Sequence, residues 1–388
     1  MDRPIIYFDN AATSWPKPPE VRRAMDQYLD AVGGNPGRAG HRLAVAAARV
    51  VAGAREALAR LLNAPDPARI VFTKNATEAL NLAILGSLAP GDHVITGSLE
   101  HNAVMRPLRY LEAQGVTLTV VACPPDGRPD LEEVRRALRP NTRLLVFTHA
   151  SNVFGTLLPI EELAHLAREA GVPLLVDAAQ TAGCVPIDLQ RTPIDLLALS
   201  GHKGLFGPPG TGALYIGAGV GPRPLVFGGT GSRSEEEQQP MVLPDRYEAG
   251  TLNVVGLAGL AAGLEFIAAT GVAAIRAHEQ RLLQHFLAGA ALLEGITIYG
   301  PRDPARQIGV VSFNIAGLSP SEVGLALDEV YGIMARVGLH CAPAAHRTGG
   351  TFPRGTVRFG WSWFNTEAQV DQALDALDAL RRTAATLA

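Results

Sequence analysis

The sequence predicts an α/β protein whose larger part is a mostly parallel, seven-stranded sheet covered by helices on both faces. Three observations support this fold class. Between about residues 68 and 217, seven strand-like runs alternate with amphipathic helical stretches. The runs are continuously apolar, which is typical of parallel strands buried on both faces. Polar residues gather where several of the runs end, and such sheets bind ligands beyond the carboxyl ends of their strands.

The strand and helix candidates of this part can be assigned in chain order. The strand candidates are "RIVFT", "DHVITG", "VTLTVVAC", "RLLVFTHAS", "VPLLVDAAQ", "DLLALS" and "GALYIG". The helical candidates between them have apolar residues at helical spacing and are "EALNLAILGSL", "LEEVRRALR" and "IEELAHLAREAG". A polar, glycine-rich segment, residues 227–253, then breaks the alternation.

The remainder of the chain predicts a smaller α+β domain. It begins with an apolar helix over residues 254–269 and a long helix around residues 273–293. Strand candidates follow with one helix, "SPSEVGLALDEV", among them and a helix at the C-terminus; the strands are "ITIYG", "GVVSFNIAG", "IMARVG" and "TVRFGWSWFN". We therefore expect a large domain over residues 16–254 and a small domain made of residues 1–15 and 255–388.

Composition excludes several classes of function. The chain has 388 residues and a formal net charge of −3, so nothing in the charge balance favours nucleic acid or an anionic membrane as a partner. No apolar run has the uninterrupted length of a membrane helix, and the N-terminus lacks a signal-peptide pattern. Three cysteines, without zinc-site spacing, suit a reducing compartment. We expect a cytoplasmic protein without a metal site.

The stretch "GLFGPPGTGALYIG", residues 204–217, suggests a phosphate-binding loop of nucleotide-hydrolysing enzymes, but its details argue against one. Such a loop needs a lysine and then serine or threonine directly after its last glycine, and it opens a helix. Here Gly212 is followed by Ala213 and Leu214, and a strand-like run follows. The lysine of this region, Lys203, lies before the glycines and requires another explanation.

Lys203 and Asp177 each follow an apolar strand, and together they suit pyridoxal phosphate. A lysine held away from water loses its proton readily and forms a Schiff base with an aldehyde. A carboxylate against the pyridine nitrogen keeps that ring protonated, so that it can accept electrons. Alone, Lys203 could equally be a surface loop residue and Asp177 a helix cap.

Further strand ends supply groups that could hold such a cofactor. Asn75, Ala76 and Thr77 lie where a strand turns into a helix, and free N–H groups there favour a phosphate, although the same residues could serve only as a helix cap. His101 could stack on the cofactor ring and move protons. Amide groups that could donate to the ring oxygen belong to Asn152 and Gln180.

The ordered set of motifs resembles the class V aminotransferases, a group of fold-type I pyridoxal phosphate enzymes, and within them the cysteine desulfurases most closely. The motifs that carry the resemblance are "YFDNAATS", "NATEALN", "EHNA", "SNVFGT", "VDAAQTAG", "SGHKGLFGP" and "AGTLN". They extend from about Tyr7 to Asn365, which is nearly the whole chain. The resemblance implies a fold-type I transferase with pyridoxal phosphate as cofactor and L-cysteine as substrate.

The resemblance also implies roles for individual residues. Lys203 would carry the cofactor and shuttle protons, Asp177 would face the pyridine nitrogen, His101 would stack on the ring and Gln180 would contact its oxygen. The phosphate would be held by Ala76, Thr77, Ser200 and His202. Thr251 would reach the phosphate of a neighbouring subunit, which implies a homodimer with shared active sites. The expected substrate-binding residues are Asn10, Ala11, Arg38, His41, Asn152, Arg336 and Arg358.

The segment "RVGLHCAPAAH" decides the expected reaction. A desulfurase needs a thiolate that takes sulfur from cysteine as a persulfide, leaving alanine. Cys341 lies in a Gly/Pro-bounded loop where His340 and Arg336 could favour the thiolate, and Arg358 is suited to clamp a carboxylate. The segment resembles that of the group II, SUF-type desulfurases, whose cysteine loop is short and ordered. Cys123 and Cys184, in or beside apolar runs, are interpreted as structural.

Two departures from the family pattern and several alternatives remain. Leu339 stands where the pattern has histidine, and Gly37 stands where a substrate-contacting histidine is expected, which leaves the roles of Arg38 and His41 open. A C–S lyase acting on cysteine or cystine would release pyruvate and would not need Cys341. A selenocysteine lyase would use the same site. A non-catalytic sulfur-assembly scaffold or a transaminase fits these residues poorly. The resemblance implies a sulfur-acceptor protein, whose identity the sequence does not give.

Overall fold

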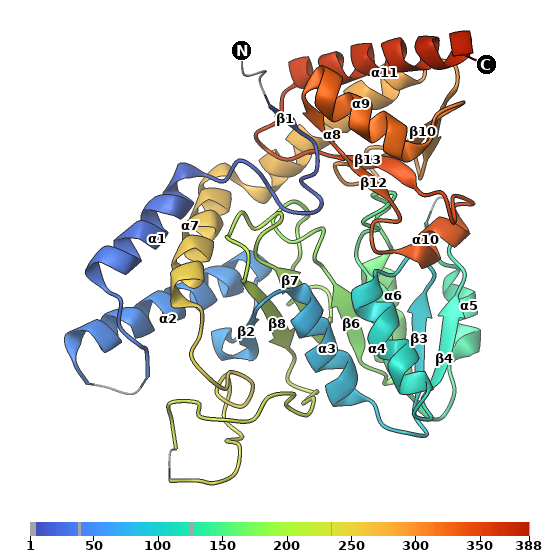
Figure 1. Cartoon of the computed structure of the whole chain (residues 1–388). Coiled ribbons are helices and arrows are strands. Elements are labelled where there is room, and N and C mark those ends of the chain that lie inside the picture. Colours follow the sequence, from blue (N-terminus) through green and yellow to red (C-terminus); the bar gives the residue numbers. More distant parts are fainter. Residues whose placement is uncertain (1–4, 38–39, 125–126, 234, 388) are drawn as a thin grey trace.

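The computed structural model describes residues 5–37, 40–124, 127–233 and 235–387. Figure 1 shows a large sheet with helices on both of its faces and a second, smaller sheet with its own helices above it. Both described ends of the chain lie beside the smaller sheet. The site described below lies at the edge of the large sheet that faces this second layer.

The large sheet has seven strands in the order β2-β8-β7-β6-β5-β3-β4. Strands β3 to β7 pair in parallel wherever they are neighbours, and β8 runs antiparallel to both β7 and β2. The predicted mostly parallel, seven-stranded sheet is therefore confirmed. The strands are β2 (Ile70–Thr73), β3 (His93–Gly97), β4 (Thr117–Val121), β5 (Thr142–Thr148), β6 (Leu174–Asp177), β7 (Leu196–Ser200) and β8 (Gly212–Ile216).

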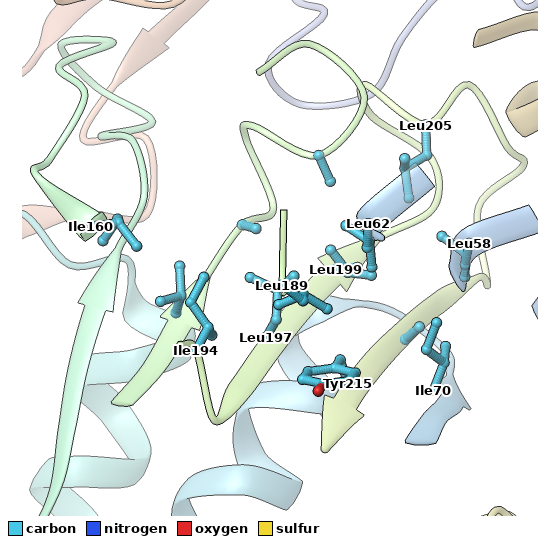
Figure 2. Close-up of a cluster of buried hydrophobic side chains, with 14 of the residues drawn as sticks. Leu58, Leu62, Ile70, Ile160, Leu189, Ile194, Leu197, Leu199, Leu205 and Tyr215 are labelled. Atoms are coloured by element: carbon cyan, nitrogen blue, oxygen red, sulfur yellow. The ribbon is translucent and has the colours of Figure 1, made fainter. Parts of the chain in front are cut away.

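Helices cover both faces of this sheet because its strands are apolar on both sides. On one face α3 (Ala76–Ser87) and α4 (Asn102–Glu112) pack against the sheet. The other face carries a larger core, part of which Figure 2 shows, with Leu58 and Leu62 lying near Ile70, Leu197 and Leu199. The helices on that face are α2 (Arg42–Leu62), α5 (Leu131–Ala137), α6 (Ile160–Ala170) and α7 (Val254–Thr270).

The smaller sheet is antiparallel, with the strand order β12-β13-β10-β9. Helices α8, α9 and α11 pack with it around a separate apolar core that includes Ile6 and Phe8 from the start of the chain. Its strands are β9 (Ile296–Tyr299), β10 (Val310–Ile315), β12 (Arg336–Gly338) and β13 (Thr356–Gly360). Its helices are α8 (Val272–Ala290), α9 (Pro320–Tyr331) and α11 (Glu367–Leu387), and the short helix α10 (Pro343–Thr348) lies nearby.

The predicted strand "IMARVG" is divided between two sheets. Its first residues form β11 (Ile333–Met334), which pairs in parallel with β1 (Ile6–Tyr7), and its last form β12. The run is short and Arg336 is its only charged residue, so its pattern gave no sign of the break. The pairing with β1 ties the N-terminal segment to the smaller sheet.

Helix α7 packs on the core of the large sheet together with α2 and with α1 (Pro19–Ala31). Our proposed domain division at residues 15 and 254 assigns α7 to the small domain, and this packing favours a boundary after α7 instead. Among the described residues, no single helix has the length and apolarity to cross a membrane; α7 and α8 together pass that test but are bent by 81°.

Glycines allow the loop after β7 to approach the start of α3. A Cβ atom placed on Gly212 would lie 2.6 Å from backbone atoms of Asn75, and one placed on Gly201 would lie 2.1 Å from Thr211 Oγ1. The glycine-rich stretch thus leads into β8 and packs against the residue that caps α3. This explains its composition without a nucleotide.

We predict that Gly212→Ala lowers the free energy of unfolding by about 1–3 kcal/mol. The added Cβ would contact backbone atoms of Asn75, which cannot rotate away as a side chain could. Urea unfolding of the cofactor-free protein measures it. Gly53→Ala in α2 is the matched control, because its Cβ meets nothing within 4 Å. It should be neutral or stabilising by up to about 1 kcal/mol. Equal effects of the two variants would contradict the packing argument.

Candidate active site

A cavity of about 80 Å³ lies at the carboxyl ends of β5, β6 and β7, where sheets of this kind bind their ligands. Of the predicted cofactor ligands, all but Thr251 line it: Ala76, Thr77, His101, Asn152, Asp177, Gln180, Ser200, His202 and Lys203. The structure therefore brings together residues as far apart in the sequence as Ala76 and Lys203, which are separated by 127 positions.

Lys203 and Asp177 are a buried cation and anion within this cavity. Burial lowers the pKa of Lys203 to about 8, and the Asp177 carboxylate acts in the opposite direction. Burial raises the pKa of Asp177, while the Ala179 N–H, 2.9 Å from Oδ1, and Lys203 both oppose this. Each charge is thus kept in a dry site partly by the other. An amine with a lowered pKa is the form that reacts with an aldehyde.

The N-terminus of α3 opens into the cavity. Asn75 caps the helix, its side chain accepting from the Glu78 N–H at 2.9 Å, so the cap is Asn75 and not Thr77. Ala76 and Thr77 occupy the first turn, where backbone N–H groups favour an anion. His202 lines the same cavity, and its buried Nδ1 has no hydrogen-bond partner among the described residues. These groups suit a phosphate.

His101 is held in one orientation by α4. It is the N-cap of that helix, and its Nδ1 accepts from the Ala103 N–H at 3.0 Å. Burial, with smaller contributions from Lys203 and Arg358, lowers its pKa to about 4. His101 is therefore neutral near pH 7, with its proton on Nε2. A neutral, fixed ring is suited to stacking on a planar cofactor.

The N-terminal segment holds the backbone beneath Lys203. The carbonyl oxygen of His202 accepts from the Ser14 N–H at 3.0 Å, from Thr13 Oγ1 at 3.1 Å and from Lys17 Nζ at 2.8 Å. Ser14 Oγ also donates to the Lys203 carbonyl at 2.9 Å. Sequence reasoning missed this clamp, because Thr13 and Lys17 resemble ordinary loop residues.

Cys341 lies in a short, constrained loop between β12 and α10. It is exposed, and both His340 and Cys341 adopt left-handed backbone angles, with φ of 48° and 58°. Their carbonyls are fixed from the large domain: Asn152 Nδ2 donates to His340 at 2.7 Å, and the Asn102 N–H donates to Cys341 at 2.8 Å. Such backbone angles are tolerated where surrounding contacts impose them.

A second cavity, of about 430 Å³, borders the cofactor cavity and is lined in part by Cys341. Thr77, His101 and Ala103 line both cavities, and Cys341 lines the second. The thiol therefore opens toward the side of the site where His101 stands. This is the position required of a group that receives an atom from a bound substrate.

The expectation that His340 supplies positive charge to Cys341 is wrong. His340 is buried, its Nε2 lies 3.0 Å from Thr356 Oγ1, and burial lowers its pKa to about 2. It is therefore a neutral residue that packs beneath the loop. Sequence proximity did not reveal its burial.

Arg358 is buried on β13 and faces the same region. It donates to Asp9 Oδ1 at 2.8 Å and to the Asn152 carbonyl at 2.9 Å. Burial lowers its pKa, and the nearby Asp9 and Cys341 raise it. Arg336, on the neighbouring strand, lies 3.9 Å from the other Asp9 oxygen. Asp9, which the sequence analysis left without a role, thus orients both arginines.

The other predicted residues are distributed around this centre. Gln180 Nε2 donates to the Ala11 carbonyl at 3.0 Å, and Asn10 hydrogen-bonds Gly360 and Asn365, so these residues join the two parts of the protein. His41 caps α2 and does not line the cavity, while Arg38 lies outside the described residues. Thr251 is exposed and lines a separate cavity.

A family model described as "Aminotransferase class-V" matches residues 6–373. The chain belongs to the class-V aminotransferase family. Enzymes of this family related to the chain use pyridoxal phosphate as cofactor. The resemblance inferred from the motifs is confirmed at this level.

Cysteine desulfurases are among the relatives and solved structures that are similar to the chain. A protein of Methanothermobacter thermautotrophicus named "Probable cysteine desulfurase" is 35% identical over 97% of this chain and 95% of its own length. Its counterpart in Pyrococcus abyssi is 37% identical over 98% and 95%. An apo cysteine desulfurase of Thermococcus onnurineus matches with a TM-score of 0.90, at 35% identity over 98% and 95% of the two chains.

The residues of the cavity fit pyridoxal phosphate. The unpaired His202 Nδ1 and the first turn of α3 can receive its phosphate, Asp177 can face a protonated ring nitrogen, and Lys203 supplies the amine. Each feature was expected from the class-V aminotransferase motifs. Together they place an amine, a carboxylate and the groups that can bind a phosphate around one cavity.

We predict that cofactor uptake by the apoenzyme follows the pKa of Lys203. Only the neutral amine reacts, so below pH 8 the rate should rise about tenfold per pH unit and level off near pH 8. Stopped-flow absorbance measures it, with a lysine model amide, whose pKa is about 10.4, as the control. A rate that keeps rising above pH 9, as the control does, would contradict the lowered pKa.

Proposed function

We propose that this chain is a pyridoxal phosphate-dependent cysteine desulfurase that converts L-cysteine to L-alanine and leaves a persulfide on Cys341. The activity is supported by relatives of that name, which match at 32–37% identity over nearly the whole chain. The observation that carries the role of Cys341 is its exposed thiol in a cavity shared with His101.

The residues of the chain divide the reaction between them. Arg358, oriented by Asp9, binds the substrate carboxylate, with Arg336 beside it. The cofactor, when bound, supplies an electron sink for the substrate carbon skeleton. Cys341 attacks the substrate sulfur; the S–S bond forms as the Cβ–S bond breaks, and its electron pair stays with the carbon skeleton. Lys203 moves the protons that complete alanine.

The shape of the Cys341 loop supports the finer assignment to the group II, SUF-type desulfurases. Only residues 339–342 separate β12 from α10, and two of their carbonyls are hydrogen-bonded to the large domain. A loop of this kind cannot carry its sulfur far. We therefore propose that a sulfur acceptor, such as a carrier protein, comes to Cys341.

A homodimer with shared sites is the second part of the proposal. The long segment between β8 and α7 extends away from the large sheet in Figure 1 and exposes Leu225, Val226, Phe227, Met241 and Val242. Thr251 at its end does not line the cofactor cavity of its own chain. Both features suit an interface through which Thr251 reaches the cofactor phosphate of a partner. Cytoplasmic localisation remains a prediction from the sequence.

We predict that wild-type enzyme releases alanine and, with a reductant, sulfide from L-cysteine, and that Cys341→Ala releases neither while keeping the cofactor's colour. Amino-acid analysis and sulfide trapping measure the products. Cys123→Ala, which replaces a thiol buried in the core of the large sheet, should retain both products.

Other products would identify the alternatives. Pyruvate and ammonia, unaffected by Cys341→Ala, would show a C–S lyase. Alanine from selenocysteine but not from cysteine would show a selenocysteine lyase. Each result would remove Cys341 from the proposed role as persulfide carrier for L-cysteine.

We predict that the wild-type protein sediments as a dimer and that the double substitution Phe227→Asp and Met241→Asp shifts it to monomer, because both side chains are about 70% exposed in the single chain. Leu292→Asp, exposed by 81% at the end of α8, is the matched control and should stay dimeric. A monomeric wild type, or an unaffected double variant, would count against this interface.

A further inference from the structure

A third, small cavity of about 30 Å³ lies beside Lys203 and includes Glu279, to which the proposed reaction gives no role. It is formed where the N-terminal segment, the loop after β6, α8 and the end of β13 meet. Gln180 and Lys203 line both this cavity and the cofactor cavity. Lys203 therefore lies between the cofactor cavity and this third cavity.

Two buried hydrogen-bond donors of this cavity are unsatisfied. Trp361 is 3% exposed and Ser362 is 5% exposed, and neither Trp361 Nε1 nor Ser362 Oγ has a partner in the part of the chain that the structure describes. A buried donor without a partner is destabilising. A polar cavity with room for water normally holds ordered water that accepts such hydrogen bonds.

The same cavity contains a buried carboxyl group that the reaction as described does not use. Glu279 of α8 is 5% exposed and packs against Gly309, where an added Cβ would lie 3.3 Å from Glu279 Oε2. The titratable groups that act on the pKa of Glu279 are Arg276 from its own helix and Cys184 from the loop after β6, and Lys203 lines the same cavity. From the β10 side only the Gly309 N–H reaches it.

Two groups that line this cavity, Glu279 and Lys203, have similar pKa values. Burial raises the pKa of Glu279 to about 8, although Arg276, Cys184 and the Gly309 N–H act against the increase. Burial lowers the pKa of Lys203 to about 8. A proton can move between two groups most readily when their pKa values match.

We propose that this cavity holds ordered water that links the Glu279 carboxyl group to the Lys203 amine, so that Glu279 is a positioning residue that stores the proton Lys203 gives up or takes back. In the forward step an ammonium proton of Lys203 passes through water to the Glu279 carboxylate, giving a neutral amine and a carboxylic acid. The reverse step restores both charges. Trp361 and Ser362 fix the water.

This inference rests on the proposed role of Lys203 and adds a route for its protons. Cys341 does not line this cavity; it lines a different cavity, together with His101. Protons for Lys203 would therefore not need to cross the space where sulfur is transferred. A merely structural role of Glu279 would need neither the water nor the matched pKa.

The test uses the holoenzyme reconstituted with pyridoxal phosphate and compares wild type with Glu279→Gln. Infrared difference spectra of the wild type should show a protonated carboxyl band that titrates near pH 8 and is absent from the variant. The variant's kcat should fall roughly tenfold, at or below the lower end of direct acid–base effects, and its pH profile should shift, while the cofactor's colour remains. Glu265→Gln, exposed on α7, is the matched control.

Stability provides a second readout with a defined sign. The folded-state pKa of Glu279 lies above the unfolded value of 4.5. Its contribution to the free energy of unfolding is therefore fully present below pH 4.5 and is lost as the pH rises to about 8. Relative to Glu265→Gln, Glu279→Gln should remove this fall in stability over that pH range. An unchanged pH profile together with no titrating carboxyl band would overturn the proposal.

A second variant guards against a folding defect of the first. Trp361→Phe keeps the ring but removes the Nε1 donor, and it should lower kcat several-fold without loss of colour. Trp363→Phe, which packs on His278 outside the cavity, should not. Added chloride should change nothing; a chloride-dependent pH profile would mean that an anion and not water occupies the cavity. The inference would be refuted if the Glu279 and Trp361 variants were coloured and had normal kcat and pH profiles. A colourless Lys203→Ala protein would, in that case, still support the proposed role of Lys203.

Discussion

The burial of Lys203 beside Asp177 is the constraint on which the rest of the site depends. A lone buried charge is costly, and each of these two is tolerated because the other lies in the same cavity. Strands β6 and β7 pair in parallel with Asp177 opposite Ala198, so the sheet itself places Asp177 beside the strand that leads to Lys203. The N-terminal clamp on the His202 carbonyl then fixes the loop that carries the amine. The other elements shape the space around this pair.

The two parts of the protein are joined through the substrate-binding region and not around it. Arg358 of the smaller sheet donates to the Asn152 carbonyl, and the Asn152 side chain in turn holds the His340 carbonyl. Asp9, from the first segment of the chain, completes this network. A shift of one part against the other would disturb the arginine and the thiol loop together. In the proposed function, substrate binding and sulfur transfer thus share one set of hydrogen bonds.

The sequence predicted the features that local patterns determine. Apolar runs gave the sheet, and residues placed directly after strands, such as Lys203 and Asp177, could be assigned because parallel strand ends meet at one edge. Features that depend on distant contacts were not predictable. The burial of His340, the role of Asp9 and the clamp by Lys17 arise from segments some 190 to 350 residues apart, and no local pattern records them.

Lys203 stands between surroundings of different character, and this follows from the fold. Toward α3 and α4 the site continues into the cavity of Cys341, which a substrate or acceptor can reach because the thiol is exposed. Toward α8 it meets Glu279, Trp361 and Ser362, all buried where the two parts of the protein close on each other. Sulfur chemistry needs access, whereas a group that shuttles protons needs a protected environment with a controlled pKa. Placing the lysine at the junction of the two domains provides both conditions at one residue.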